Sequence, residues 1–342
     1  MKDTIQIGIV GAGIMGTRHA RIYSELPSAR LIGIADVNGS KAKALAAEYP
    51  GVKAVTDYHE LLQMPELDVL HVATPDFLHK EPVIDGLKAG KHILVEKPMA
   101  TTVKDANEIV QISKDTGKHV MVNYTHRWAA PYAKTKQLVT DGVIGDAVVV
   151  YARKDDRIWA ATEMMNWTAK TSSASYLSTH DIDLVLWFLN TDIESVYALG
   201  VKGVLAARGI DTEDAIQALV RFKNGAIGTF ESSWVLPNSM PTTTDSFIEI
   251  VGQKGTIHVD RIHEGLKVAT PEAYEFPKLS MCTEIDGKLR GGVPCALENL
   301  VESLRRDEAP QPDAANGLKI VKVSTAIQLS IKRKEAVYIE EL

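Results

Sequence analysis

Cysteine is scarce in this chain of 342 residues, which contains only Cys282 and Cys295. Disulfide-stabilised folds need a much denser set of cysteines. We therefore expect two unpaired thiols in a reducing compartment, and a cytoplasmic protein. No histidine or cysteine cluster joins these two residues to complete a tetrahedral metal site, so no metal is expected.

Long apolar segments are also absent, since no stretch reaches the ~20 consecutive apolar residues that cross a bilayer. The short apolar run at residues 5–10 ends in glycine, and we interpret it as a strand and not as a signal peptide. Basic residues are not in excess either, because the formal net charge is -6. Nucleic-acid binding needs clustered Lys and Arg. We expect neither a membrane nor a nucleic acid as partner.

Strand-like and helix-like segments alternate along residues 1–123. Short apolar runs at 5–10, 31–35, 69–73 and 92–96 suit buried parallel strands, with helical segments between them. This alternation predicts right-handed crossovers and a doubly wound parallel sheet with helices on both faces, an α/β domain of the Rossmann type. Ligands then bind beyond the carboxyl ends of the strands.

Residues 124–342 show a different pattern, with strand signals joined by hairpin turns. The runs 214–222 and 226–234 are separated by Asn224-Gly225, a strong turn signal. We expect an α+β domain with a large open, mostly antiparallel sheet that binds substrate and mediates oligomerisation. Its helix 316–332 is expected to pack back toward the first domain. A sheet face left uncovered predicts a homodimer or homotetramer.

A Gly-Ala-Gly-Ile-Met-Gly sequence follows the first predicted strand and opens a helix, a context that makes it a specific dinucleotide-binding fingerprint. The first glycine permits a tight turn, the second lets the backbone approach a pyrophosphate, and the third lets the helix pack on the strand. The N–H groups of the helix start face the phosphates. The residues expected to contact the cofactor are Gly11, Gly13, Ile14, Met15 and Gly16.

Asp36 ends the second predicted strand, 25 residues after Gly11. Its carboxylate would accept hydrogen bonds from the adenosine ribose and repel a 2′-phosphate, which favours NAD over NADP. The next residues, Val37 and Asn38, offer no cation for that phosphate. A carboxylate that merely caps the strand end is the alternative interpretation.

Further along, four segments resemble motifs of the Gfo/Idh/MocA oxidoreductases, in the same order as in that family. They are Ala73-Thr74-Pro75 with His79, Glu96-Lys97-Pro98, Tyr124-Thr125-His126-Arg127-Trp128, and Thr179-His180-Asp181-Ile182-Asp183. The resemblance implies an NAD-dependent dehydrogenase of sugars, cyclitols or related polyols. It also implies that Thr74, Pro75, His79, Glu96 and Lys97 lie at the cofactor.

Oxidation of a secondary alcohol requires a base that takes the hydroxyl proton. Lys97 follows the predicted strand 92–96, and a lysine shielded from water beside a cationic ring has its pKa lowered, which suits this role. The resemblance implies the same role, and a cis bond from Lys97 to Pro98. The alternative is a solvated lysine before a proline that starts a helix.

His180 is the second candidate for proton transfer, because imidazole titrates near neutrality; a helix cap is its alternative role. Many family members carry an aspartate four residues before this histidine, where this chain has Tyr176. Tyr176 either hydrogen-bonds to the substrate or covers the sugar. Without that aspartate, the sequence does not determine how a proton would pass between Lys97 and His180.

The irregular segment 153–170 mixes aromatic and charged residues, as sugar sites do. The residues expected to contact substrate are Tyr124, His126, Asp155, Arg157, Trp159, Trp167 and His180. Each of them has a purely structural alternative, and Arg157 would also suit an anionic substrate.

Three functions fit these residues. The first is a dehydrogenase that transfers a hydride between a polyol hydroxyl and nicotinamide. The second is a redox-assisted glycosidase or eliminase, in which bound NAD is reduced and reoxidised within one turnover. The third is a non-catalytic NAD-binding sensor. Net formation of NADH separates the first from the other two.

Overall fold

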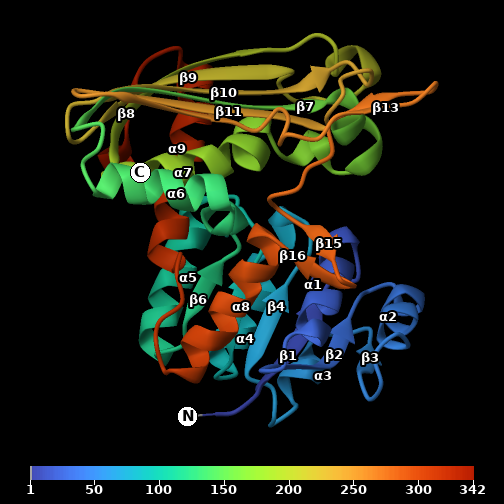
Figure 1. The fold of residues 1–342 in the computed structure, drawn as a ribbon. Helices are drawn as coiled ribbons and strands as arrows, with labels where there is room; N and C mark the ends of the chain where they lie inside the picture. The colour runs from blue at the N-terminus through green and yellow to red at the C-terminus, as the bar shows by residue number, and fades with distance from the viewer. Residues whose placement is uncertain (1) are drawn as a thin grey trace. The chain divides into compact units, whose positions relative to one another are not determined.

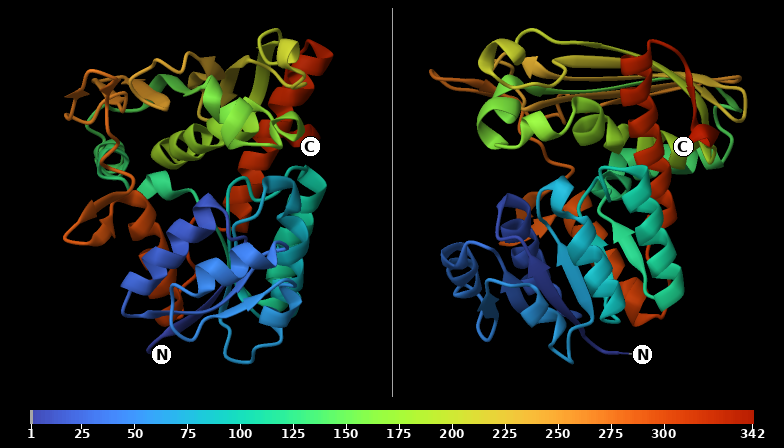
Figure 2. Two further views of the ribbon diagram at one scale, coloured as in Figure 1. Left: turned by 90° about the vertical axis from the view of Figure 1, so that its right-hand side faces the viewer. Right: turned by 180° about the vertical axis from the view of Figure 1, so that it is seen from behind.

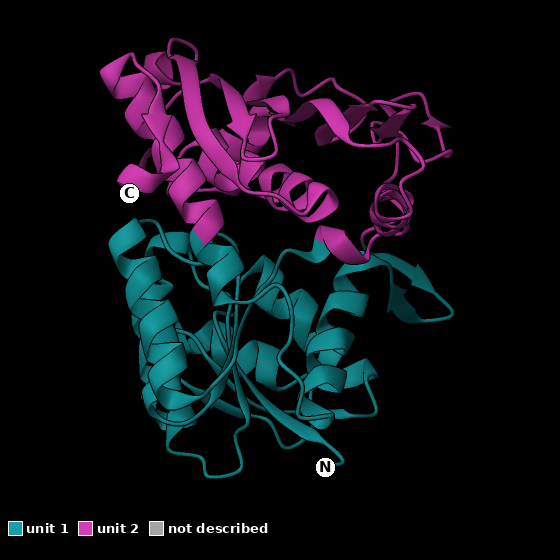
Figure 3. Cartoon of the chain, turned by 90° about the vertical axis from the view of Figure 1, so that its left-hand side faces the viewer, with its two compact units in different colours: residues 1–125, 282–318 teal, residues 126–281, 319–342 magenta. Residues whose placement is uncertain are grey.

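The computed structural model describes residues 2–342 and divides them into two compact units (Figure 3). The first unit comprises residues up to 125 together with 282–318, and the second comprises 126–281 and 319–342. Among residues 2–342, no helix has the length and hydropathy of a membrane span.

The first unit is built on a six-stranded sheet of order β3-β2-β1-β4-β5-β6, in which every neighbouring pair runs parallel (Figure 1). This is the doubly wound Rossmann order, which confirms the predicted fold class of this half. The strands are β1 Ile5–Val10, β2 Ala29–Ala35, β3 Lys53–Val55, β4 Val69–Val72, β5 His92–Val95 and β6 Val120–Val122. Since β1, β4 and β6 are almost wholly buried, their residues form a continuous apolar core instead of an alternating one.

Helices cover both faces of this sheet (Figure 2). They are α1 Ile14–Glu25, α2 Gly39–Ala46, α3 His59–Leu62, α4 Lys80–Lys88, α5 Val103–Thr116 and α8 Gly292–Arg305. Local signals define their ends. Thr102 caps α5 by accepting a hydrogen bond from the N–H of Asp105, and Gly117 ends the helix in the left-handed conformation, with φ 65°.

The segment 282–318 returns to the first unit. Its hairpin β15 Thr283–Ile285 and β16 Lys288–Arg290 joins α1 through an ion pair of 2.6 Å between Arg21 and Glu284. Further on, Glu302 accepts a hydrogen bond of 2.8 Å from the hydroxyl of Ser28. Sequence analysis had assigned all of 124–342 to one domain. The compact units divide the chain differently here, and α9 Ala314–Arg333 contributes residues to both.

The second unit contains a seven-stranded sheet of order β12-β11-β7-β10-β9-β8-β17, in which only β7 and β10 pair in parallel. This confirms the predicted open, mostly antiparallel sheet. The strands are β7 Ala147–Arg157, β8 Ile193–Val201, β9 Ala215–Phe222, β10 Ile227–Leu236, β11 Thr244–Gly252, β12 Thr256–Asp260 and β17 Val337–Tyr338. A small hairpin, β13 Val268–Ala269 with β14 Tyr274–Glu275, lies outside it.

One face of this sheet is covered by helices, and the other is open (Figure 1). The covering helices are α6 Ala130–Thr140, α7 Thr179–Leu189 and the end of α9. Strand alternation separates the two faces. On the open face, Tyr197, Leu199 and Leu219 are 40%, 61% and 52% exposed. On the covered face, Ala152, Ala198 and Ala218 are fully buried.

Candidate active site

The start of α1 in the first unit forms a phosphate-binding turn. Gly11 has φ +105°, and a Cβ there would lie 2.5 Å from the carbonyl oxygen of Ala73. A Cβ on Gly16 would lie 1.8 Å from the carbonyl oxygen of Gly11, so the helix packs closely on the turn. A Cβ on Gly13, by contrast, would meet nothing within 4 Å. The backbone at Gly13 is therefore open to a ligand.

The same helix start carries the electrostatics of an anion site. Gly13 is the N-cap of α1 and supplies no side-chain cap, and the first turn contains no acidic residue. Its first N–H groups and the positive end of the helix dipole are therefore not neutralised by side chains. Ile14 is 64% exposed here. These features fit a dinucleotide pyrophosphate.

Asp36 follows β2 and faces the glycine turn. Its carboxylate accepts hydrogen bonds of 2.8 Å from the N–H groups of Ala12 and Asn38. It thus caps the strand end, and each oxygen keeps lone-pair capacity for a ribose hydroxyl. Val37 beside it is 96% exposed and offers no positive charge.

Residues after β4, β5 and β6 meet at the same edge of the sheet. The ring nitrogens of His79 lie 2.8 Å from the carbonyl oxygen of Pro98 and 2.9 Å from that of Thr74. His79 is buried and connects these two loops through both of its ring nitrogens. Thr74 Oγ1 and Asn123 Oδ1 are buried, and within residues 2–342 neither has a hydrogen-bond partner. Both atoms can therefore form hydrogen bonds with a ligand or with water at this edge of the sheet.

Lys97 follows Glu96 directly after β5, and the Lys97-Pro98 peptide bond is cis, as the resemblance implied. Glu96 is buried and accepts a hydrogen bond of 2.7 Å from the amide of Asn123. Burial raises the pKa of Glu96, while the amide of Asn123 and the charge of Lys97 oppose that shift. Tyr124, two residues beyond β6, has no exposed surface.

In the second unit, two of the predicted residues lie together. His180, in the first turn of α7, and His126 have ring centroids 4.2 Å apart and planes tilted by 46°. The adjacent Arg127 makes two hydrogen bonds, of 2.9 and 2.6 Å, to the buried carboxylate of Asp183. This pair connects the segment containing His126 to α7, so it fixes the two histidines relative to each other.

A buried ion pair that the sequence analysis did not single out lies next to them. Lys154 on β7 is 3.2 Å from Asp181 and donates a hydrogen bond of 3.0 Å to Ser246. Burial raises the pKa of Asp181 to about 6, against the opposing charge of Lys154. Helix α7 thus presents His180 at its surface while Asp181 points to the covered face of the sheet.

Strand alternation places Asp155 on the opposite face from Lys154. Asp155 pairs across the sheet with Ser233 and Asp245 and lies on the open face, where Arg153 is 3.9 Å away. Burial, with repulsion from Glu231 and Asp245, raises the pKa of Asp155 to about 7. The structure therefore does not bring Asp155 together with His180.

Two of the remaining predicted residues pack against an apolar cluster. Tyr176 and Trp167 pack against a core that contains Trp234 and Leu205, and the rings of Tyr176 and Trp234 are 6.4 Å apart. Trp159 is 38% exposed, and its backbone N–H bonds to the side chain of Asn238. Arg157 donates to the carbonyl oxygen of Met240, so its guanidinium is engaged with the backbone.

Two family models match this chain over almost its whole length. Residues 5–124 match an oxidoreductase family with an NAD-binding Rossmann fold, and residues 136–339 match the C-terminal alpha/beta domain of the same family. The chain belongs to the Gfo/Idh/MocA oxidoreductase family. The earlier resemblance is thereby confirmed, and with it the NAD-binding nature of the first unit.

Relatives within the Gfo/Idh/MocA family match from end to end. The chain is 26% identical over 343 residues to the myo-inositol 2-dehydrogenase of Thermotoga maritima, covering 99% of both proteins. It is 27% identical over 341 residues to the inositol 2-dehydrogenase of Rubrobacter xylanophilus, covering 97% of this chain and 92% of that protein. A solved scyllo-inositol dehydrogenase from Lactobacillus casei shares the fold with TM-score 0.84 and 21% identity, covering 98% and 99% of the two chains.

Proposed function

We propose that this Gfo/Idh/MocA protein oxidises a secondary hydroxyl of a cyclitol, sugar or related polyol with NAD. One observation carries the proposal: the open helix start at Gly13, the carboxylate of Asp36 and the lysine after β5 all lie at carboxyl ends of the same parallel sheet. The polyol class is supported by the inositol dehydrogenases that the chain matches from end to end.

In this proposal the first unit holds NAD and the second unit binds the polyol. The glycine turn binds the pyrophosphate, Asp36 accepts the ribose hydroxyls, and Thr74 and Asn123 satisfy polar groups nearer the nicotinamide. NAD, when bound, supplies the hydride acceptor. Asp36 also disfavours the 2′-phosphate of NADP, because two negative charges would meet there.

Lys97 and His180 are proposed to move the proton. Lys97 takes it from the hydroxyl as the carbinol carbon loses its hydride, so alcohol becomes ketone with one proton released. His180 passes that proton on to water, and the ring of His126 orients it. Tyr176 is supported by its apolar surroundings as a cover for the sugar ring.

Absorbance at the NADH band tests the reaction directly, with inositols, aldoses and glycosides as substrates and NAD or NADP as acceptor. We expect NADH to form with NAD and at least one cyclitol or sugar. Tight NAD binding without net NADH from any of them would contradict the dehydrogenase. Products cleaved without net NADH would then indicate the redox-assisted glycosidase, and no product at all would indicate the sensor.

Substitution of Lys97 tests the proton step. We expect Lys97→Ala to lower kcat about 10²- to 10⁴-fold, the usual contribution of general base catalysis, while the Kd for NAD stays within a few-fold. Lys104→Ala, at an exposed lysine of α5, is the matched control. An unchanged kcat in Lys97→Ala would remove the assigned role. A double variant with His180→Ala that is no slower than the worse single variant would show that the two residues serve one step.

A further inference from the structure

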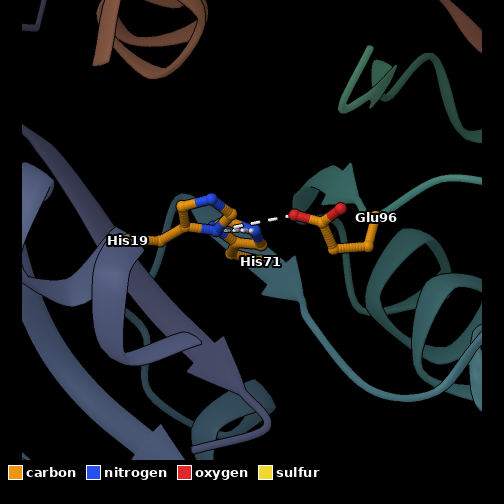
Figure 4. Close-up of side chains that lie close together, drawn as sticks. All are labelled: His19, His71 and Glu96. Carbon is orange, nitrogen blue, oxygen red and sulfur yellow. Dashed lines mark hydrogen bonds and ion pairs between the residues drawn. The ribbon is translucent and has the colours of Figure 1, made fainter. Parts of the chain in front are cut away.

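Five polar side chains form a connected cluster in the interior of the first unit, and Figure 4 draws three of them, His19, His71 and Glu96. Of the five, only Asn123 has a role in the proposed cofactor site. Tyr23 Oη lies 3.1 Å from His71 Nδ1, and His71 Nε2 lies 3.1 Å from His19 Nδ1. Nδ1 of His19 is in turn 3.7 Å from Glu96 Oε1, the oxygen to which Asn123 donates. The members come from α1, β4 and the ends of β5 and β6.

This cluster is costly to bury, which indicates a role beyond filling space. Tyr23, His19 and His71 have no exposed surface. Burial lowers the pKa of His19 well below its usual value and that of His71 to about 3, so both rings are neutral. Each neutral ring carries one N–H, and the two rings and Tyr23 therefore form a directed chain of hydrogen bonds that ends beside Glu96.

Two histidines and a glutamate are also the side chains of many metal sites, and their ligand atoms lie within 4.8 Å of one another. The partners of the ring nitrogens argue for hydrogen bonding instead. His71 Nε2 lies 3.1 Å from His19 Nδ1, and His71 Nδ1 lies 3.1 Å from the hydroxyl of Tyr23, so both nitrogens of His71 have hydrogen-bond partners.

We propose that His19 and His71 are positioning residues that, with Asn123, hold the Glu96 carboxyl and thereby set the orientation and charge state of Lys97. The inference rests on the proposed role of Lys97. Glu96 and Lys97 are adjacent in sequence, and the backbone N–H of Lys97 donates to the Glu96 carboxyl. Their coupling is reciprocal: the charge of Lys97 lowers the pKa of Glu96, so an ionised Glu96 raises the proton affinity of Lys97.

Several charged and polar groups face Glu96, and each of them can influence its charge. They are His19 and Arg18 from α1, His71 from β4, Lys97 itself and Asn123 after β6. Only Arg18 and Lys97 are cations. Loss of the histidine chain removes the polar ring that lies 3.7 Å from Glu96 Oε1. We expect the carboxyl then to favour its neutral form, which weakens its hold on the proton of Lys97.

The titration of Lys97 can be followed by NMR in ¹³Cε-lysine-labelled protein with NAD bound, using Lys97→Arg to assign the signal. We expect Glu96→Gln to move the midpoint to lower pH by about one unit, as for the loss of a nearby opposite charge. His71→Leu should move it in the same direction and His71→Gln should restore it, because Gln keeps a donor and an acceptor. Ile93→Val, at a buried position on β5, is the packing control and should change nothing.

Tyr23→Phe removes a single hydroxyl and replaces His71→Leu in the experiment if that variant does not fold. We expect it to move the titration midpoint of Lys97 in the same direction by a smaller amount. Midpoints in Glu96→Gln and Tyr23→Phe that coincide with the wild type would overturn the proposal. So would one equivalent of Zn²⁺ bound by wild type and lost in Glu96→Gln or His71→Leu, which would reveal a cation site on His19, His71 and Glu96. The NMR titration needs no substrate, so its outcome is independent of whether NADH forms. Failure to form NADH would contradict only the proposed reaction.

Turnover gives a second measurement in the same variants. We expect kcat to fall and the acid limb of its pH profile to move to lower pH, while KM stays unchanged.

Discussion

Asp36 shows how a single carboxylate links the fold to cofactor choice. It holds the backbone of the glycine turn through Ala12 and that of its own loop through Asn38, and its remaining lone pairs face the ribose site. We expect Asp36→Ala to lower the ratio of kcat/KM for NAD to that for NADP by about 10- to 100-fold, the worth of a hydrogen bond to a charged group. Steady-state kinetics with both cofactors measures it. A wild-type enzyme that prefers NADP would show this assignment of Asp36 to be wrong.

The ionisation of Asp155 gives a prediction about stability. Its folded-state pKa of about 7 lies above the unfolded value of 3.8, so its favourable contribution is present below pH ~3.8 and is lost as the pH rises through ~7. Asp155→Asn removes the charge, and its amide can donate to the neighbouring Glu231 or Asp245. We expect a higher Tm than wild type at pH 7.5, with the difference shrinking steadily toward pH 4.

Thermal unfolding by circular dichroism across that range measures the effect, and Glu272→Gln, on an exposed loop, is the control. A difference that is the same at pH 7.5 and pH 4 would mean that the charge of Asp155 is not the cause.

Single residues were predictable where one local motif defines them. The glycine turn and Asp36 belong to one strand–helix–strand unit, so spacing alone placed them. The cluster of Tyr23, His19, His71 and Glu96 joins a helix to two different strands, and no local spacing marks it. Lys154 was overlooked for another reason: it lies among Asp155 and Arg157, and the sequence does not say which face of β7 the helices cover.

At the scale of elements, the start of α1 separates requirements of the fold from those of the ligand. A side chain at Gly16 would collide with the carbonyl of Gly11, whereas one at Gly13 would meet no protein atom within 4 Å. We expect Gly13→Val to keep the wild-type Tm within a few degrees and to weaken NAD binding at least about tenfold, because the branched side chain occupies the approach to the pyrophosphate. Gly16→Ala should instead lower the Tm markedly.

Differential scanning fluorimetry gives the Tm of both variants, and titration calorimetry with NAD gives the affinity. If Gly13→Val binds NAD as tightly as wild type, the phosphates do not lie at this helix start. The elements themselves were largely predictable, since alternating strands and helices in one half and hairpin turns in the other determine the two sheet types. The end of β7 was not: this strand runs to Arg157, into the segment 153–170 that was expected to be irregular, because it pairs there with β10 and β11.

At the scale of the whole chain, the return of residues 282–318 to the first unit was beyond sequence analysis. The contacts that hold this segment, such as Glu284 with Arg21 and Glu302 with Ser28, join residues more than 260 positions apart. The local sequence of residues 282–318 does not show whether they pack on the sheet of the second unit, which precedes them in the chain, or on the first unit. Such contacts are decided by packing, and the same holds for the face of the second sheet that remains open.

That open face leads to the last prediction, the assembly of the protein. Tyr197, Leu199, Leu219 and Ile227 are each at least 40% exposed there, on adjacent strands and with no covering helix. Contiguous exposed apolar side chains of this kind are typical of protein interfaces, and a second copy of the chain offers a matching surface.

We expect light scattering after size exclusion to show a dimer or tetramer. In Leu219→Lys we expect a shift toward the mass of a single chain, because the substitution buries a charge in the contact. Val143→Lys, at an exposed apolar residue outside this face, should leave the mass unchanged. A wild-type protein with the mass of one chain at all concentrations would contradict the assembly, and a Leu219→Lys variant that keeps the wild-type mass would place the contact on another surface.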